Sequence, residues 1–532
     1  MYGRLIHRFW RPRVKLKSSP KLSKHTVSWQ EPASRLPSMT GPFDFTFLNE
    51  KGNLIEVGWD GPSREKLWRY NQHYFDDLNA QNGYERKSWH NDLIEKWIVE
   101  NPPLVGTGWE SYPTSLRIVN WIKWNLGGNQ LSASALENLF IQLRWLNKRL
   151  EYHLLGNHLL ANAKALVFGG LFFEGKEAEK WLIKGLRILN REIEEQILPD
   201  GGHFELSTMY HALAFEDILD LLNITKAYST KLSREQQTKI STIPNVAKSM
   251  HQWLKNMCHP DGEISFFNDS AFNVAPSVSE LDSYFKRLEI ENSKAIDKNL
   301  TFLKDSGYVR IRNGSAVAIM DVAKIGPDYL PGHGHADTLS FELSVDKQRV
   351  FVNSGTSCYG ISAERLRQRG THAHNTLVIN GKDSSEVWAG FRVAKRANPC
   401  DIKVDESEDG TCISIDASHD GYKKIFNRHI IHRRRWKFED NNLAINDKID
   451  GKFFCSEVLF HLHPDVIVDI EIESNFSVGS ILLSEGYKMQ FSTDGRAKLN
   501  DSTWHPYFGV IQNCKVISVT FDKNEVNTIV SW

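Results

Sequence analysis

The sequence has few cysteines and no closely paired ones. Six cysteines occur among 532 residues and none form a Cys-x-x-Cys pair, so neither a zinc ribbon nor a disulfide framework is indicated. No run of about 18 apolar residues is present, and we therefore expect no integral membrane segment. Residues 1–25 are basic but lack the apolar stretch of a secretory signal, so no export address is visible in the sequence.

Charge of one sign is not in excess either. The chain has 65 basic and 65 acidic residues, which argues against a generalised electrostatic hold on nucleic acid. Aromatic residues are abundant, with 16 Trp and 15 Tyr, and their flat rings suit both protein cores and the apolar faces of sugars. A chain of 532 residues exceeds what one hydrophobic core usually supports, so more than one domain is expected.

Helical periodicity dominates residues 66–287. Apolar residues recur every three or four positions over 182–197, and this predicted helix stops at the Pro-Asp-Gly turn at 199–201. A second predicted helix, 246–257, also ends at a Pro-Asp-Gly turn, and a short polar and aromatic segment follows each turn. This weak repeat of helical hairpins predicts an α-toroid or a solenoid.

Past residue 300 the apolar period changes from helical to two, and strand-like runs alternate with Gly, Asn and Asp turns. Many helices followed by many short strands predict an all-α domain joined to a β-sandwich, an α+β multidomain chain. We divide the chain into a basic, flexible or peripheral arm at 1–40, a helical domain at 41–290 and a sandwich domain at 300–532. The predicted strands include 308–311, 316–319, 349–352, 376–379, 412–415 and 466–468.

Two histidines, His333 and His335, stand in a Gly-His-Gly-His-Ala-Asp segment just before an alternating apolar run. This pattern predicts a loop that leads into a half-buried strand. Imidazole changes charge near neutral pH and is the commonest metal ligand, so proton transfer and metal binding are both open. His374 and the turn at Asn353 could complete a metal site with His335, although the spacing matches no compact zinc motif.

Two dipeptides in the helical region carry candidate chemistry. Asn157 and His158 begin an apolar helical run, where a helix cap and a functional amide with an imidazole are both reasonable interpretations. Tyr210 and His211 open a later predicted helix, and Tyr210 belongs either to the edge of the core or to a site.

A loop rich in proline, glycine and aromatic residues spans 101–113 and contains Trp109 and Tyr112. Such a loop is typical of a sugar-binding wall, and equally of a packed loop. We predict that Trp109, Tyr112 and His211 contact substrate.

In this order, the motifs of the chain resemble those of the heparinase II/III family of polysaccharide lyases. The resemblance rests on Gly-Asn-His-Leu, Met-Tyr-His, His-Gly-His-Ala-Asp, Asn-Ser-Gly-Thr and Ala-His-Asn-Thr, and it spans about residues 60–465. It implies an incomplete α/α toroid followed by an antiparallel β-sandwich, with an anionic polysaccharide bound in the cleft between them. It also points to the periplasm, where degradative members of the family typically act.

The resemblance further implies β-elimination on a uronic-acid-containing polysaccharide. The C5 proton beside a carboxylate is too weakly acidic to leave unaided, so the enzyme must neutralise that carboxylate and stabilise the enolate. By motif position, Asn157 would hold the carboxylate with His158 beside it. Tyr210 would act as base, or as acid toward the departing 4-oxygen, with His333 as the partner base. This proton chemistry requires no cofactor.

The same resemblance implies a structural zinc ion held by His335, His374 and residue 353. Relatives usually carry an aspartate at the last position, whereas this chain has Asn353, and a neutral amide oxygen is a poor Zn²⁺ ligand. We therefore expect the two histidines of the Gly-His-Gly-His segment to diverge, with His333 facing the substrate and His335 facing the sandwich. The segment should then not be a regular strand.

Two other functions use the same residues. A uronyl C5-epimerase would abstract the same proton and return it to the opposite face of the sugar. A non-catalytic protein would only bind polysaccharide or assist its assembly.

Overall fold

The structure is a computed structural model that describes residues 19–290, 298–473, 476–484 and 486–532. The chain forms two compact units and passes between them several times. Unit 1 comprises Met1–Gln196, Ala214–Lys248 and Ser279–Glu291, and unit 2 comprises Ile197–Leu213, Ser249–Val278 and Asn292–Trp532. The helical region predicted at 41–290 thus contributes two segments to the unit that contains the sandwich.

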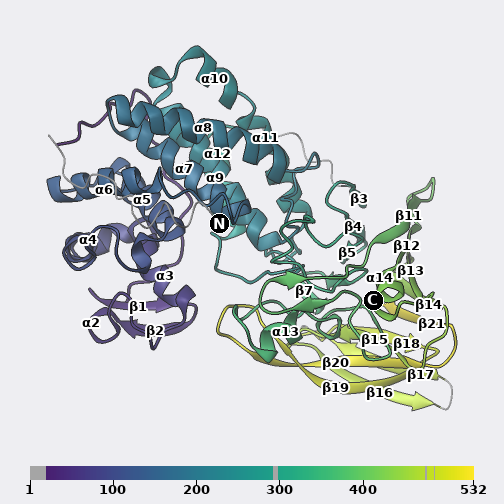
Figure 1. Ribbon diagram of the computed structural model, residues 1–532. Helices are drawn as coiled ribbons and strands as arrows, with labels where there is room; N and C mark the ends of the chain where they lie inside the picture. The colour runs from purple at the N-terminus through teal and green to yellow at the C-terminus, as the bar shows by residue number, and fades with distance from the viewer. Residues whose placement is uncertain (1–18, 291–297, 474–475, 485) are drawn as a thin grey trace. The chain divides into compact units, whose positions relative to one another are not determined.

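Unit 1 is built mainly of helices (purple to teal in Figure 1). In α8 (Lys176–Gln196), the spacing of buried Leu182, Leu186, Leu189 and Ile193 confirms the predicted amphipathic helix. The small sheet of this unit pairs β1 (Asp44–Phe47) with β2 (Glu50–Asn53). Three further helices, α9 (Thr208–Ala227), α11 (Ile243–Asn256) and α12 (Val278–Arg287), have residues in both units. The other helices of unit 1 are α2 (Leu54–Val57), α3 (Lys66–Tyr74), η1 (Asp76–Asn79), η2 (Gly83–Arg86), α4 (Lys87–Glu100), η3 (Thr107–Trp109), α5 (Ser111–Leu126), α6 (Ala133–Leu146), α7 (Gly156–Phe172), α8 (Lys176–Gln196), η4 (Ser229–Lys231) and α10 (Arg234–Ile240).

Residues 19–40 run along the helices of unit 1. The backbone of Ser23 donates a hydrogen bond to the carbonyl of Phe172, and Ala33 and Met39 are buried. Most of the side chains in this stretch are exposed or half-buried, so the described part of the predicted arm lies at the periphery of the helices. Residues 1–18 lie outside the described residues.

The two Pro-Asp-Gly turns predicted from the sequence have the same local structure. Each is closed by an isolated antiparallel bridge, Ile197 with His203 after α8 and Cys258 with Ile264 after α11. The glycines of the two turns have φ values of +91° and +89°, which only glycine adopts at little cost. Both turns belong to unit 2, so the two copies of the weak repeat each contribute a similar loop segment to that unit.

Unit 2 contains antiparallel sheets, as predicted, which are stacked in layers (green to yellow in Figure 1). Their strand orders are β3-β4-β5-β6-β7, β19-β20-β15-β8, β11-β12-β13-β14-β21-β18-β17-β16 and the hairpin β10-β9. The elements are β3 (Leu300–Leu303), β4 (Tyr308–Asn313), β5 (Ala316–Asp321), β6 (Phe341–Val345), β7 (Gln348–Phe351), α13 (Ala363–Arg369), η5 (Thr371–Ala373), β8 (Leu377–Ile379), β9 (Val387–Trp388), β10 (Arg392–Val393), β11 (Pro399–Glu406), β12 (Ile413–His419), α14 (Gly421–Phe426), β13 (Ile431–Glu439), β14 (Asn442–Asp450), β15 (Ser456–His461), β16 (Ile467–Glu473), β17 (Phe476–Leu482), β18 (Lys488–Thr493), β19 (Arg496–Trp504), β20 (Gln512–Phe521) and β21 (Glu525–Ser531).

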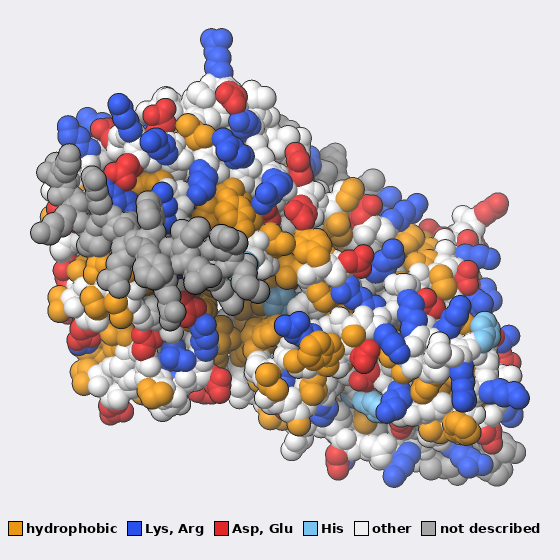
Figure 2. All heavy atoms as spheres, in the orientation of Figure 1, with side chains coloured by type: hydrophobic (Ala, Val, Ile, Leu, Met, Phe, Trp, Pro, Cys, Tyr) orange, Lys and Arg blue, Asp and Glu red, His pale blue; other side chains and the backbone are white. Residues whose placement is uncertain are grey.

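The core of the sandwich is one continuous apolar cluster to which all three large sheets contribute. Phe341, Trp436, Phe460 and Ile517 are fully buried in it, and burying each such side chain stabilises the fold by about 2 kcal/mol. On the face drawn in Figure 2, basic and acidic side chains are interspersed, as the balanced composition suggests. Among the described helices, none combines the length and the apolar character needed to cross a bilayer.

Candidate active site

The Gly-His-Gly-His segment is an irregular loop before β6, as predicted. The ring of His333 lies against the ring of Tyr210, with their centroids 3.9 Å apart. The ring of His335 instead lies 5.3 Å from that of His374. The two rings thus have different neighbours, Tyr210 for His333 and His374 for His335, but both also contact one carboxylate, so the expected divergence is incomplete.

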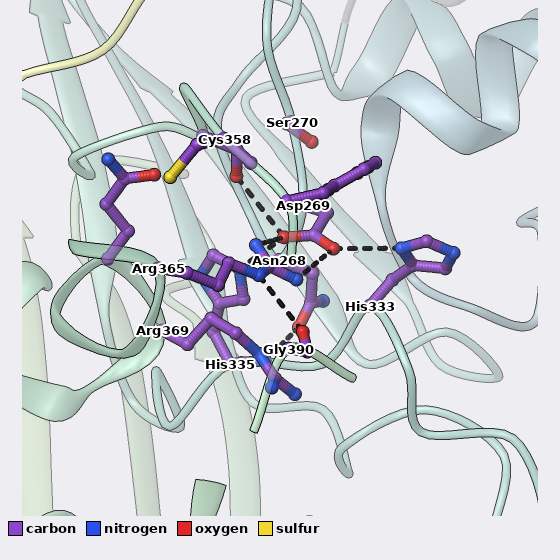
Figure 3. A network of polar contacts seen from close by, with 12 residues as sticks. Asn268, Asp269, Ser270, His333, His335, Cys358, Arg365, Arg369 and Gly390 are labelled. Carbon is purple, nitrogen blue, oxygen red and sulfur yellow. Dashed lines mark hydrogen bonds and ion pairs between the residues drawn. The ribbon is translucent and has the colours of Figure 1, made fainter. Parts of the chain in front are cut away.

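Asp269 joins the two histidines from a different part of the chain. Its Oδ2 is 2.8 Å from Nδ1 of His333, and its Oδ1 is 2.8 Å from Nε2 of His335. Arg365 donates to both carboxylate oxygens, and Figure 3 shows Arg365 and His333 approaching Asp269 from opposite sides. Each histidine thus presents its other ring nitrogen away from one shared carboxylate.

The Asp269 carboxylate is fully buried and ionised. Burial by itself would raise its pKa, but the charge of Arg365 and the hydrogen bonds from His333 and His335 outweigh burial and hold the pKa well below the ordinary value. Because the carboxylate only accepts hydrogen bonds, the neutral form of His333 carries its proton on Nδ1, and Nε2 is the nitrogen that can accept another proton.

Glu205 contacts that second nitrogen. Its Oε2 is 3.4 Å from Nε2 of His333, and the glutamate side chain is buried. Glu205 and Asp269 follow the first and the second Pro-Asp-Gly turn respectively, so the two repeated segments place a carboxylate on each side of the His333 ring. A proton taken up by this ring would be stabilised by the ionised Asp269 carboxylate.

Tyr210 lies in the first turn of α9. The hydroxyl of Ser207, the residue before the helix, accepts a hydrogen bond from the Tyr210 backbone N–H, as helix-capping side chains do. The Tyr210 hydroxyl is 2.9 Å from that of Tyr359. Burial, followed by the nearby Tyr359 and Asp269, raises the pKa of Tyr210 well above its ordinary value. The side chain is therefore a neutral phenol that can donate a proton.

Four predicted site residues, Trp109 among them, lie in unit 1. Asn157 occupies the first turn of α7, but the capping position is Leu155, so Asn157 does not cap the helix. His158 lies against the ring of Tyr112 at a centroid distance of 4.5 Å, and its Nδ1 is 3.4 Å from a carboxylate oxygen of Glu151. The structure thus brings Tyr112 and His158 together at the beginning of α7.

Trp109 is a core residue, and the prediction that it binds substrate is wrong. Only 2% of its surface is exposed, and its indole N–H donates to the carbonyl of Asn101. Its ring packs against those of Trp97 and Trp145. The aromatic loop is therefore part of the helical core, because packing the Trp109 ring against two other indole rings removes its apolar surface from water.

His211 is also buried, so the prediction that it contacts substrate is wrong as well. Its Nδ1 accepts a hydrogen bond from the backbone N–H of His203, and its Nε2 donates to the carbonyl of Met250. The ring thus satisfies two backbone groups within unit 2, which is a structural role.

The residues predicted to bind zinc fit that ion only in part. His335 Nδ1 and His374 Nε2 are buried nitrogens without a hydrogen-bond partner in the described residues. The side-chain oxygen of Asn353 is 3.1 Å from Nδ1 of His374. Within the described ranges, no group of three His, Cys, Asp or Glu residues could hold a metal ion. The donor set lacks an anionic ligand, so it does not fit Zn²⁺ as it stands.

Restoring a carboxylate should therefore create the zinc site. We expect wild-type protein purified from zinc-supplemented cells and dialysed to retain little zinc, and Asn353→Asp to retain about one zinc ion per chain. Elemental analysis of both proteins measures this difference, with Asn353→Ala as the matched control. Stoichiometric zinc in the wild type would contradict the expectation.

A helical unit and an antiparallel sandwich with a paired tyrosine and histidine define a protein of the toroid-and-sandwich class. A family model for the heparinase II/III N-terminus matches residues 79–289, and one described as heparinase II/III-like, C-terminal, matches residues 295–532. The chain therefore belongs to the heparinase II/III family, as the sequence motifs predicted.

Curated relatives and solved structures agree with this assignment. The chain is 30% identical to a heparin-sulfate lyase of Bacteroides stercoris over 56% of its own length and 44% of the relative's. It is 25% identical to one of Bacteroides thetaiotaomicron over 65% and 54% of the two lengths. The chain thus spans about half the length of these relatives. A crystal structure of heparinase III is similar in fold, with a TM-score of 0.67, 19% identity and coverage of 87% of this chain and 76% of that one.

Four residues of the site were not predicted from the sequence: Glu205, Asp269, Tyr359 and Arg365. For the two carboxylates the only signal was the repeated Pro-Asp-Gly turn, which both residues follow. For Arg365 the signal was its spacing of four residues from Arg369, which places both side chains on one face of a helix. Tyr359 carries no signal beyond its residue type.

Removal of the Asp269 charge should destabilise the protein. In Asp269→Asn, the buried Arg365 loses its carboxylate partner, and we expect the free energy of unfolding to fall by about 3 kcal/mol. Urea denaturation measures this change. The matched control is Asp401→Asn, which removes an exposed partner of Arg433 and should leave the urea midpoint nearly unchanged. Equal midpoints for both variants would contradict the role of Asp269.

Proposed function

We propose that the chain is a polysaccharide lyase that cleaves a uronic-acid-containing polysaccharide by β-elimination. The observation that carries the proposal is the contact between the Tyr210 phenol and the His333 imidazole. An enzyme for this reaction needs one group that removes a proton from C5 and another that protonates the departing 4-oxygen. The family and the names of its curated relatives support the same reaction class.

In the proposed reaction, Nε2 of His333 takes the proton from C5 of the uronic acid. The C4–O4 bond then breaks, the electron pair of the former C5–H bond forms the C4–C5 double bond, and Tyr210 donates its phenolic proton to O4. The raised pKa of Tyr210 favours this acid role over the role of base. The imidazolium formed at His333 is stabilised by the Asp269 carboxylate.

Tyr359 assists the second step by holding the Tyr210 hydroxyl. As Tyr210 gives its proton to O4, the developing phenolate accepts a hydrogen bond from Tyr359. This bond lowers the free energy needed to form the buried negative charge on Tyr210. The role of Asn157 in binding the substrate carboxylate, with His158 beside it, stays a prediction, since both residues belong to the other compact unit.

A screen of uronic-acid polymers tests the proposal. The folded protein is incubated with heparin, heparan sulfate, chondroitin sulfate, hyaluronan, alginate and bacterial capsular uronans while ultraviolet absorbance is followed, because the unsaturated product absorbs there. We expect absorbance to rise with at least one polymer and to stay flat with the His333→Ala variant. No rise with any polymer would contradict the proposal.

The same samples distinguish the two alternative functions. In deuterated water, a C5-epimerase would introduce deuterium at C5 without shortening the chain, which mass spectrometry detects. A non-catalytic binding protein would do neither, and its retention on immobilised polymer would be unaffected by His333→Ala. Unsaturated products of reduced length therefore support the lyase alone.

A further inference from the structure

A short hairpin borders the Tyr210–His333 pair, and neither the sequence motifs nor the proposed reaction assigns it a role. It spans residues 386–395, where β9 and β10 pair through Trp388 with Arg392 and Val387 with Val393. Backbone hydrogen bonds between Glu386 and Lys395 and between Ala394 and Glu386 close its base. We refer to residues 386–395 as the site hairpin.

The tip of the site hairpin is attached to the same residues that hold His333. Arg365 binds the Asp269 carboxylate and also donates through Nε to the carbonyl of Gly390 at 3.0 Å, as Figure 3 shows. Arg369 donates to the carbonyl of Ala389 and to that of Gly334, the residue after His333. Two buried guanidinium groups thus fix the hairpin to the loop that carries the proposed base.

The hairpin also lies directly against that loop. The Phe391 ring is 5.9 Å from the His333 ring and 5.2 Å from the Tyr359 ring. A Cβ atom built on Gly332 would be 3.7 Å from Cβ of Phe391, an ordinary van der Waals contact. The hairpin therefore lies beside the partly exposed His333 ring.

The outer surface of the site hairpin is both aromatic and positive. Trp388 is 47% exposed and Phe391 42% exposed, although large apolar rings are usually buried. The guanidinium of Arg392 lies over the Trp388 ring at 5.2 Å. Arg392 is exposed and makes no ion pair with any described residue. An indole ring with an available positive charge beside it matches a sugar ring that carries an acidic group.

We propose that the site hairpin is a binding subsite for an acidic sugar residue next to the one that is cleaved. Trp388 stacks on the apolar face of the pyranose ring, and Arg392 pairs with the carboxylate or sulfate group of that residue. The inference rests on the proposed lyase function for its substrate class. It does not depend on turnover, because the subsite binds a part of the chain that does not react.

The test uses Trp388→Ala and Arg392→Gln in the full chain. Because the contact is the same in the ground state and the transition state, KM should rise about tenfold for Trp388→Ala and about fivefold for Arg392→Gln, with kcat within about twofold. The matched controls, Phe454→Ala and Arg428→Gln, remove an exposed ring and an exposed charge elsewhere on unit 2 and should leave KM unchanged.

A binding measurement separates this inference from the lyase proposal. Native electrophoresis through gels that contain heparan sulfate, or its unsulfated backbone heparosan, reports retardation without turnover. Weaker retardation of both hairpin variants supports the subsite even if no polymer is cleaved. A loss for Arg392→Gln with heparan sulfate alone assigns the charge to sulfate, and a loss with both polymers assigns it to the uronic carboxylate.

Other outcomes would overturn the subsite. Unchanged KM and unchanged retardation in both variants would contradict it, and so would a wild-type protein that is not retarded by any uronic-acid polymer. A change in sedimentation of Trp388→Ala without a change in retardation would assign this face to a second copy of the chain instead.

Discussion

Replacing Tyr210 with phenylalanine is expected to lower kcat by about 100- to 10,000-fold, the usual range for loss of a proton donor. The variant keeps the ring that packs on His333 and removes only the hydroxyl that contacts Tyr359. Since the phenol acts on the departing oxygen, its loss should affect the transition state more than binding, and KM should change little. Initial rates of ultraviolet absorbance on the polymer identified by the screen measure both constants.

The matched control is Tyr507→Phe, which removes a phenolic hydroxyl from another tyrosine of unit 2. It should retain wild-type kcat, and both variants should have wild-type circular dichroism and thermal midpoints. A Tyr210→Phe variant with kcat within threefold of the wild type would exclude Tyr210 as the acid. His333 would then have to serve both proton transfers, and the division of labour between the two rings would be wrong.

The sequence predicted the parts of the site that are local in the chain. The switch from helical to alternating periodicity near residue 300 indicated the helical and sandwich parts, and the Gly-His-Gly-His segment is irregular, as expected. These features follow from backbone preferences and apolar spacing, which neighbouring residues determine.

The parts that depend on long-range contacts were not predictable from one sequence. Asp269 lies 64 positions before His333 in a loop without periodicity, and only the folded chain shows that both histidines share it. Trp109 illustrates the converse error, because an aromatic loop that suits a sugar also suits a core. Its burial is decided by Trp97 and Trp145, which contact it from other helices.

The protein should lose stability steeply as the solution is acidified. Burial lowers the pKa of His203, His211 and His461 to about 3 in each case, whereas an unfolded histidine titrates near pH 6.5. Between these values the unfolded chain binds three protons that the folded chain does not, so acid favours unfolding. The free energy of unfolding should fall by about 4 kcal/mol per pH unit below about pH 6.

The hydrogen bonds of His211 support the sign of this effect independently of any pKa. Its Nδ1 accepts the backbone N–H of His203, which protonation would prevent, so the folded state holds this ring neutral. Urea denaturation at several pH values between about 7 and 5 measures the slope, and His461→Gln should reduce the contribution of these three residues by about a third. The control, His153→Gln, changes an exposed side chain that is solvated in both states and should leave the slope unchanged. Unfolding free energies that are independent of pH over this range would mean that the buried rings gain protons without unfolding.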